Sequence, residues 1–105
     1  MATPESLLLS SLCDYLAMRR HYFWRSNNVP VYMPDQQRFR AMPKYSMKGV
    51  PDIILIKDGR FVGIEAKPKG KYQSKEQKDF EEKSCAAGAE YILARSIDDL
   101  VAAGL

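Results

Sequence analysis

The sequence has 105 residues, 46% hydrophobic and 28% charged, and a formal net charge of +3. This length suits one domain with its own core and is too short for two. No apolar run approaches the roughly 18 residues of a membrane span and no secretory-type leader opens the chain, so we expect a soluble, cytoplasmic protein. The single His cannot make a zinc site, and the two cysteines, which lack metal-type spacing, are expected to be reduced and partly buried.

The N-terminal segment predicts a helix. Thr3 suits the N-cap, Pro4 suits the first helical position, and Glu5 complements the positive end of the helix dipole. The helix should extend to about Arg20. Its buried stripe should consist of leucines at helical spacing, namely Leu8, Leu9, Leu12 and Leu16. Glu5 lies just upstream, on the same side of the helix as this stripe.

The following region is less regular. The aromatic segment HYFWRSNN predicts a short strand that ends in a turn at Asn27 and Asn28. Residues 29–48 contain three prolines, few apolar residues and many cations. We expect a loop there, with room for one short strand.

The stretch PDIILIKDGRFVGIEAK predicts a β-hairpin with DG as its two-residue loop, because both central positions of a type I′ turn need positive φ. This register places Asp52 opposite Glu65 and puts Lys67 on the same face as Glu65. A three-residue loop would instead slip the register by one residue and place Asp52 against Ile64.

The next helix is predicted over residues 75–87. Ser74 and Gln77 have the spacing of a capping box, and Gly88 supplies the stop. Beyond it, EYILA reads as a buried strand that joins the hairpin through a right-handed crossover. The pair Ser96 and Asp99 then opens a short last helix. The predicted order is helix, three strands, helix, strand, helix, which is a small α/β domain over residues 1–105.

Charge is unevenly distributed along this order. Residues 15–51 carry seven Lys or Arg against one acid, and residues 67–78 carry five lysines against one acid. From residue 79 onward, six acids outnumber two cations. Such segregation fits a polyanion-binding face, because each neutralised phosphate releases counterions. A lysine run is also common on an ordinary solvated surface.

The facing carboxylates of Asp52 and Glu65 raise an electrostatic problem. Like charges so placed repel, or force one carboxyl to keep its proton, unless a cation lies between them. Hard oxygen ligands without an imidazole cluster favour Mg²⁺ or Mn²⁺ over Zn²⁺. Such an ion could activate water for phosphodiester hydrolysis, with Lys67 adding positive charge. The structural alternative is an Asp that bonds nearby backbone at a strand start, beside a solvated Glu-x-Lys.

The residues Asp52, Glu65 and Lys67 resemble the PD-(D/E)xK signature of the restriction-endonuclease-like nucleases. A longer series (KGVPD, GIEAK, the S-x-x-Q helix start and GAEYILARSIDDL) resembles the VRR-NUC family of virus-type replication and repair nucleases. This resemblance covers residues 48–100 closely, and FWRSNN is similar to the strand that precedes the site in that family. It implies a restriction-endonuclease-like fold, with a small mixed central sheet flanked by helices.

The resemblance also implies roles for individual residues. Four positions match the catalytic set of the family: Asp52, Glu65, Lys67 and Gln77. Asp52 and Glu65 would bind the metal together with the backbone carbonyl of Ala66. Gln77 would be held close to the site, in addition to its capping role or instead of it. Glu5 could match an acidic metal ligand that related resolvases bring from their first helix.

Stand-alone members of the family are small phage and bacterial proteins that resemble Holliday-junction resolvases. The resemblance therefore implies a Mg²⁺- or Mn²⁺-dependent, structure-selective DNA endonuclease that cuts four-way junctions as a homodimer. The alternatives are a flap or nicking nuclease with the same site, a non-catalytic nucleic-acid-binding module, and a metal-free structural protein. The candidate DNA contacts lie in two basic segments: Arg38, Arg40, Lys44, Lys69, Lys71 and Tyr72.

Overall fold

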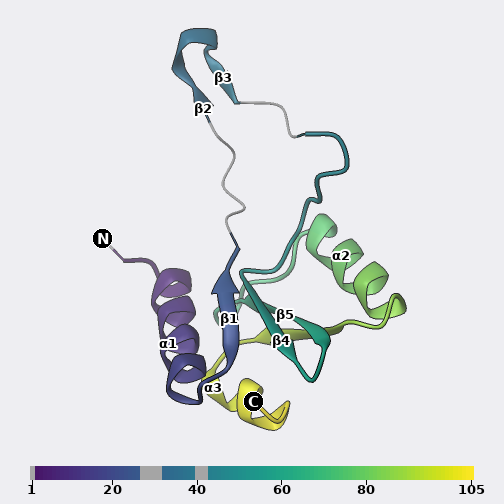
Figure 1. Cartoon of the computed structure of the whole chain (residues 1–105). Helices are drawn as coiled ribbons and strands as arrows, with labels where there is room; N and C mark the ends of the chain where they lie inside the picture. Colours follow the sequence, from purple (N-terminus) through teal and green to yellow (C-terminus); the bar gives the residue numbers. More distant parts are fainter. Residues whose placement is uncertain (1, 27–31, 40–42) are drawn as a thin grey trace.

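The computed structural model describes residues 2–26, 32–39 and 43–105 (Figure 1). These described residues form three α-helices, α1 (Pro4–Met18), α2 (Lys75–Ala86) and α3 (Ile97–Ala102). The main strands are β1 (Tyr22–Arg25), β4 (Ile53–Lys57), β5 (Arg60–Ala66) and β6 (Glu90–Ala94). Among the described residues, no helix has the length and apolar character that a membrane crossing would require.

The main strands form one mixed sheet in the order β1-β4-β5-β6. The first three pair antiparallel, whereas β6 returns parallel to β5 after the crossover through α2. Leucines of α1 and α3 pack with Leu55, Val62 and Ile64 on one face of this sheet and form the core. Helix α2 lies over the other face (Figure 1). The mixed α/β architecture with a helix-flanked sheet is therefore as predicted.

The β4–β5 hairpin has the predicted two-residue loop. Asp58 and Gly59 both have positive φ, 53° and 76°, as a type I′ turn requires. The ladder runs from Lys57 opposite Arg60 to Ile53 opposite Ile64 without a bulge. The next step in this register places Asp52 opposite Glu65, and the three-residue loop is excluded.

The predicted helix ends are confirmed to within two residues. Thr3 caps α1 through a reciprocal bond pair with Ser6, and the helix ends at Met18 because Arg20 adopts a left-handed φ of 62°. The predicted stripe on α1 is buried except for Leu8, which is partly exposed. Helix α2 begins at the predicted capping box and stops before Gly88, which has a φ of 103°.

Two expectations need correction. Residues 29–48 were expected to hold at most one short strand, yet β2 (Tyr32–Met33) and β3 (Arg38–Phe39) form a separate two-stranded sheet around a 3₁₀ turn, Pro34–Gln36. The predicted turn at residues 27–28 lies outside the described residues. Both cysteines are free, but Cys85 is exposed rather than partly buried, since no residue of α2 is fully buried.

Candidate active site

Glu65 is a charged residue type in a fully buried position. It lies on β5, between the core residues Ile64 and Ala66, and its exposed fraction is 1%. One of its oxygens, Oε1, accepts a hydrogen bond of 3.1 Å from Nε2 of Gln77 on α2. The other, Oε2, is buried and has no hydrogen-bond partner within the described parts of the chain. An ionised Glu65 would leave this buried acceptor without a donor, which is costly, so the carboxyl either keeps a proton that it can donate to Asp52 or is paired with a bound cation.

Two further carboxylates converge on Glu65. Carboxylate oxygens of Glu5, Asp52 and Glu65 all lie within 4.8 Å of one another. Asp52 comes from the residue before β4, and Glu5 comes from the first turn of α1. These three elements meet at the end of the sheet where β4 begins and β5 ends. The structure thus brings together all three side chains that the sequence proposed as metal ligands.

Burial has a direct electrostatic effect on Glu65. The pKa of this carboxyl is raised from an ordinary value of 4.5 to about 9, and burial, which disfavours the charged form, is the largest cause. A hydrogen bond to Asp52 and the negative charges of Asp52 and Glu5 also contribute to this raised pKa, and the ammonium of Lys67 opposes it. In the absence of a cation, Glu65 therefore keeps its proton at neutral pH. The sequence also allowed Glu65 to be an ordinary solvated glutamate on the outer face of a strand. Its burial excludes that alternative.

The backbone around Ala66 is also turned towards the carboxylates. Its N–H donates a 2.9 Å hydrogen bond to Oδ2 of Asp52, and the N–H and C=O of one strand residue point to the same side. The carbonyl of Ala66 therefore faces the same side as Asp52. Pro51 does not continue the β4 ladder, because its ring lies against Gly63 and its carbonyl accepts a hydrogen bond from the hydroxyl of Ser26. The role of this carbonyl of Ala66 as a metal ligand stays a prediction.

Gln77 performs two tasks at once. Its side-chain oxygen accepts a 2.8 Å hydrogen bond from the backbone N–H of Ser74, which completes the helix cap. Because a backbone N–H can only donate, the amide oxygen must occupy that position, and the amide nitrogen is directed to Glu65. The capping box therefore fixes the orientation of the group that holds Glu65. The sequence left these two roles open as alternatives, and the structure combines them.

Lys67 follows Ala66 and is partly buried beside the cluster. Its backbone N–H donates a hydrogen bond of 3.0 Å to the carbonyl of Ala94 on β6, and this bond fixes the chain at the end of β5. Its ammonium lowers the pKa of Glu65, so the two charges are close. Within the described ranges, Lys67 has no ion pair of 4.0 Å or less. Its positive charge is available to a bound anion.

Arg95 is a positioning residue that the sequence interpretation missed. Its Nη1 donates to the carbonyls of Pro68 and Lys71, both at 2.9 Å, and its guanidinium lies 5.7 Å from the ring centroid of Tyr72. These contacts hold the loop that follows Lys67 in one shape. The signal in the sequence was weak, because an Arg after a strand has many uses and its partners lie more than 20 residues earlier.

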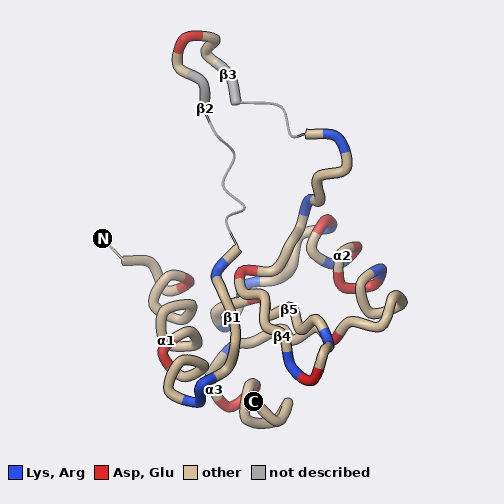
Figure 2. The backbone as a smooth tube through the Cα atoms, in the orientation of Figure 1, with Lys and Arg blue, Asp and Glu red and all other residues tan. Residues whose placement is uncertain are grey.

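Most of the candidate DNA contacts are exposed side chains. Lys69, Lys71 and Tyr72 are exposed on the loop that Arg95 holds, and Lys44 is exposed with its ammonium 5.2 Å from the ring centroid of Tyr45. Figure 2 shows where the basic and acidic residues lie along the backbone. Two further candidates are not placed: Arg38 belongs to β3 but its side chain is not described, and Arg40 lies outside the described residues.

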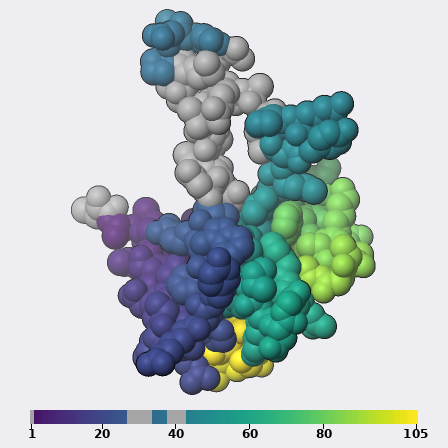
Figure 3. Space-filling view, in the orientation of Figure 1, coloured from purple at the N-terminus to yellow at the C-terminus, as the bar shows by residue number. Residues whose placement is uncertain are grey.

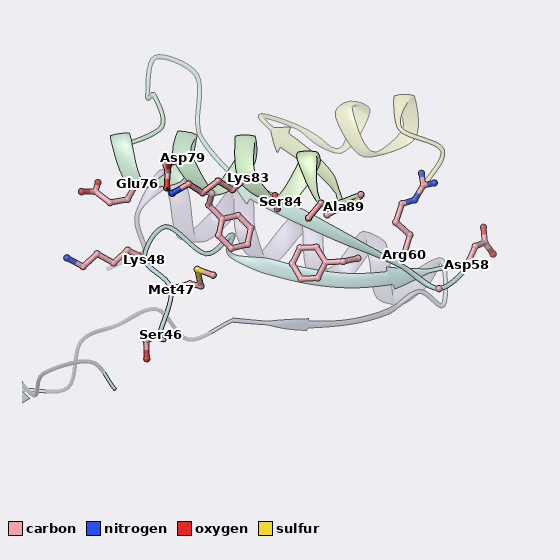
Figure 4. Close-up of a pocket in the computed structure, with 15 residues that line it drawn as sticks. Ser46, Met47, Lys48, Asp58, Arg60, Glu76, Asp79, Lys83, Ser84 and Ala89 are labelled. Atoms are coloured by element: carbon pink, nitrogen blue, oxygen red, sulfur yellow. Dashed lines mark ion pairs between the residues drawn. The ribbon is translucent and has the colours of Figure 1, made fainter. Parts of the chain in front are cut away.

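A groove of about 930 Å³ lies on the α2 side of the sheet (Figure 4). Phe61 and Phe80 line it, and their ring centroids are 6.4 Å apart. Its charged lining combines both signs: Lys48, Arg60, Lys83, Asp58, Glu76 and Asp79. Lys83 and Asp79 form an ion pair of 2.9 Å. None of the predicted catalytic residues lines this groove, which is therefore distinct from the carboxylate cluster.

Gly49 is a second residue whose importance the sequence interpretation missed. It has a φ of 74°, and a Cβ at this position would overlap the carbonyl of Glu76 in the first turn of α2. Only glycine lets the segment before β4 lie this close to the helix start that carries Gln77.

We expect Gly49→Ala to lower the free energy of unfolding by about 2–4 kcal/mol, from backbone strain plus the clash. Gly70→Ala is the matched control, because Gly70 has a φ of 86° but a Cβ at this position would have no neighbouring atom within 4 Å. It should cost only about 1–2 kcal/mol, the strain alone. Urea unfolding of both variants measures the difference, and equal losses would show that the contact with α2 is unimportant.

No family model matches this chain, and no curated protein or solved structure matches it either. Its function must therefore be inferred from its own side chains. The features that carry this inference are a buried glutamate with an unpaired oxygen, two neighbouring carboxylates, and a lysine without an ion-pair partner among the described residues.

Proposed function

We propose that this protein is a metal-dependent DNA endonuclease with a restriction-endonuclease-like fold of the VRR-NUC type. The observation that carries the proposal is the buried carboxyl group of Glu65, which has a carboxylate oxygen within 4.8 Å of oxygens from Asp52 and Glu5 and whose Oε2 accepts no hydrogen bond among the described residues. A hairpin followed by a parallel crossover strand, with acids at the hairpin's open end, is the arrangement that the resemblance leads us to expect.

The donor set fits a hard divalent cation. Three carboxylates and one backbone carbonyl offer only oxygen ligands, which suits Mg²⁺ or Mn²⁺. A cation would also offset the burial and the repulsion from Asp52 that raise the pKa of Glu65, because the ionised form would then be paired. Asp52, Glu65 and the carbonyl of Ala66 are the proposed ligands, and Glu5 is a further ligand from α1.

The metal, when bound, would polarise a phosphate oxygen and increase the acidity of water beside it. The chain's own residues have three tasks around that ion. Gln77 holds Glu65 in the ligating orientation through a hydrogen bond that its capping role makes rigid. Lys67 places a positive charge next to the phosphate, where negative charge grows during hydrolysis. Asp52 is anchored by the N–H of Ala66, which donates a hydrogen bond to its Oδ2.

DNA binding is assigned to the basic segments that flank the site. Lys69 and Lys71 follow the catalytic Lys67 directly, and Tyr72 offers an exposed ring for stacking on a base. Contacts of this kind bind backbone and shape rather than sequence. We therefore propose branched DNA as the substrate, in particular a four-way junction cut by a homodimer with one site per subunit.

The experiment is a cleavage assay on a four-way junction, a flap and a linear duplex of matched sequence. Each is incubated with Mg²⁺, Mn²⁺ or EDTA, using the wild type and the near-isosteric variant Asp52→Asn. We expect metal-dependent cleavage of the junction by the wild type alone. Cleavage that persists in EDTA or in the variant would refute the metal mechanism. Equal cutting of the junction and the duplex would refute junction selectivity. Preferred cutting of the flap would favour the flap nuclease. Binding of DNA without any cutting would favour the non-catalytic module.

A further inference from the structure

The α2 face of the sheet is left uncovered at β1. Tyr22 lies on the same side as its cross-strand neighbours Ile56 and Phe61, and Trp24, two residues on, shares that side. This is the α2 side, because Phe61 packs against Phe80 of that helix. Yet Tyr22 is 73% exposed and Trp24 is 46% exposed, so α2 does not cover β1. In Figure 3, the blue β1 segment lies at the surface beside the teal hairpin.

The outer edge of β1 is also unpaired. The N–H of Ser26 donates to the carbonyl of Asp52, so residues 22, 24 and 26 direct their backbone groups towards β4. Phe23 and Arg25 therefore direct their N–H and C=O groups outward. Within the parts of the chain that the structure describes, these groups have no hydrogen-bond partner. An edge strand of this kind, with exposed aromatic side chains and no proline or bulge, is a template for pairing with another strand.

We propose that two copies of the chain pair antiparallel through β1, around a two-fold axis that passes beside Trp24, and so form one continuous sheet. In this register Phe23 lies opposite the partner's Arg25, and Arg25 lies opposite the partner's Phe23. Both pairs are of the hydrogen-bonded kind, which exchanges two N–H···O bonds per pair. Trp24 faces the partner's Trp24 at a position where Cα atoms are about 4.5 Å apart.

The outward backbone groups of β1 favour a second copy of this chain as the partner that pairs with this edge. Two outward carbonyls need N–H donors, which a DNA backbone does not have, so the occupant is a polypeptide strand. Trp24 lies midway between the two outward-facing residues, and a two-fold axis there matches every outward donor with an acceptor. The same symmetry pairs the aromatic side chains and places each Arg25 against a phenyl ring rather than against its own copy.

This pairing has a consequence for the carboxylate clusters, which rests on the function proposed above. A two-fold axis between antiparallel strands of one sheet is perpendicular to that sheet, so both Glu65 side chains face the same side. Each cluster lies two strands from the seam, near the level of Ser26. Strand spacing and rise then separate the clusters by roughly 25 Å. Two sites on one face at this spacing suit paired cuts in a single branched substrate.

Disulfide trapping tests the register. In a Cys85→Ser background, which removes the exposed native thiol, Trp24→Cys should form a symmetric cross-link under mild oxidation, since paired Cα atoms would lie within disulfide range, about 4.4–6.8 Å. Tyr22→Cys is the matched control. It should not cross-link, because the two copies of residue 22 would be about 13 Å apart along the strands. Cross-linking at residue 22 and not at residue 24 would overturn the register.

The oligomeric state tests the interface itself. Arg25→Pro removes one outward N–H without touching the bonds to β4, whereas Arg25→Ala keeps that N–H and removes only the exposed side chain. In light scattering at about 50 µM, we expect twice the 12.0 kDa chain mass for the wild type and for Arg25→Ala, and a single-chain mass for Arg25→Pro. Thermal unfolding confirms that all three fold. A monomeric wild type, or a dimeric Arg25→Pro, would refute the interface.

The result for the interface is independent of catalysis. A dimer that requires β1 but cuts no DNA would refute the nuclease and support the interface. Conversely, a monomer that cuts DNA in a metal-dependent way would refute only the interface. These two failures are therefore distinguishable in the same preparation.

Discussion

In EDTA, the wild-type protein is expected to lose stability as the pH rises between about 5 and 9, and Glu65→Gln is expected to abolish this loss. The folded protein holds a proton on Glu65 up to a pKa of about 9, whereas the unfolded chain releases it near 4.5. Between these values the folded state binds the extra proton, so stability falls with pH by up to about 1.4 kcal/mol per unit. Urea unfolding at several pH values measures the slope.

Glu65→Gln mimics the protonated carboxyl, since its amide oxygen can still accept from Gln77 and its NH₂ group can donate to Asp52. Its metal-free stability should therefore exceed that of the wild type at high pH. Glu82→Gln, on the exposed surface of α2, is the matched control and should keep the wild-type slope. Addition of Mg²⁺ should stabilise the wild type and not Glu65→Gln. Equal pH slopes for Glu65→Gln and the wild type would contradict the buried, protonated state of Glu65.

The second large effect is expected at Lys67. Lys67→Met removes the positive charge beside the proposed phosphate position while keeping a long apolar stem, and we expect kcat for junction cleavage to fall by at least about a hundredfold. KM should change little, because the lost interaction strengthens in the transition state.

Lys69→Met is the matched control, two residues along the same loop and exposed. It should weaken DNA binding and lower the dependence of affinity on salt, with kcat close to that of the wild type. Single-turnover cleavage with saturating enzyme separates the two effects. If both substitutions reduced only binding, Lys67 would be a DNA contact and not a catalytic residue.

The parts of the fold that sequence predicts well are those fixed by neighbouring residues. The turn at Asp58 and Gly59, the cap at Thr3 and the capping box at Ser74 each depend on residues at most three positions apart. The Asp58–Gly59 turn also fixes the hairpin register, and this register sets Asp52 opposite Glu65. That pairing was therefore predictable, although the nuclease role assigned to it stays a prediction.

What sequence does not predict is set by contacts between distant elements. The complete burial of Glu65 depends on α2 lying over its strand, and the reach of Glu5 depends on where α1 meets the sheet. Two other contacts also join distant segments. Arg95 bonds to the loop that contains Pro68, and Gly49 packs against the start of α2. The small β2–β3 sheet was missed because its two-residue strands are too short to show any periodicity.

The most direct test of the central claim, that the carboxylate cluster binds a divalent metal, is calorimetric titration of Mn²⁺ at about pH 7.5 in two buffers of different ionisation enthalpy. Glu65, with a pKa of about 9, holds a proton at this pH and must lose it to bind the ion. The prediction is binding at the cluster with release of about one proton per ion, lost in Asp52→Asn. Absence of binding at millimolar Mn²⁺, or equal binding by Asp52→Asn, would contradict it.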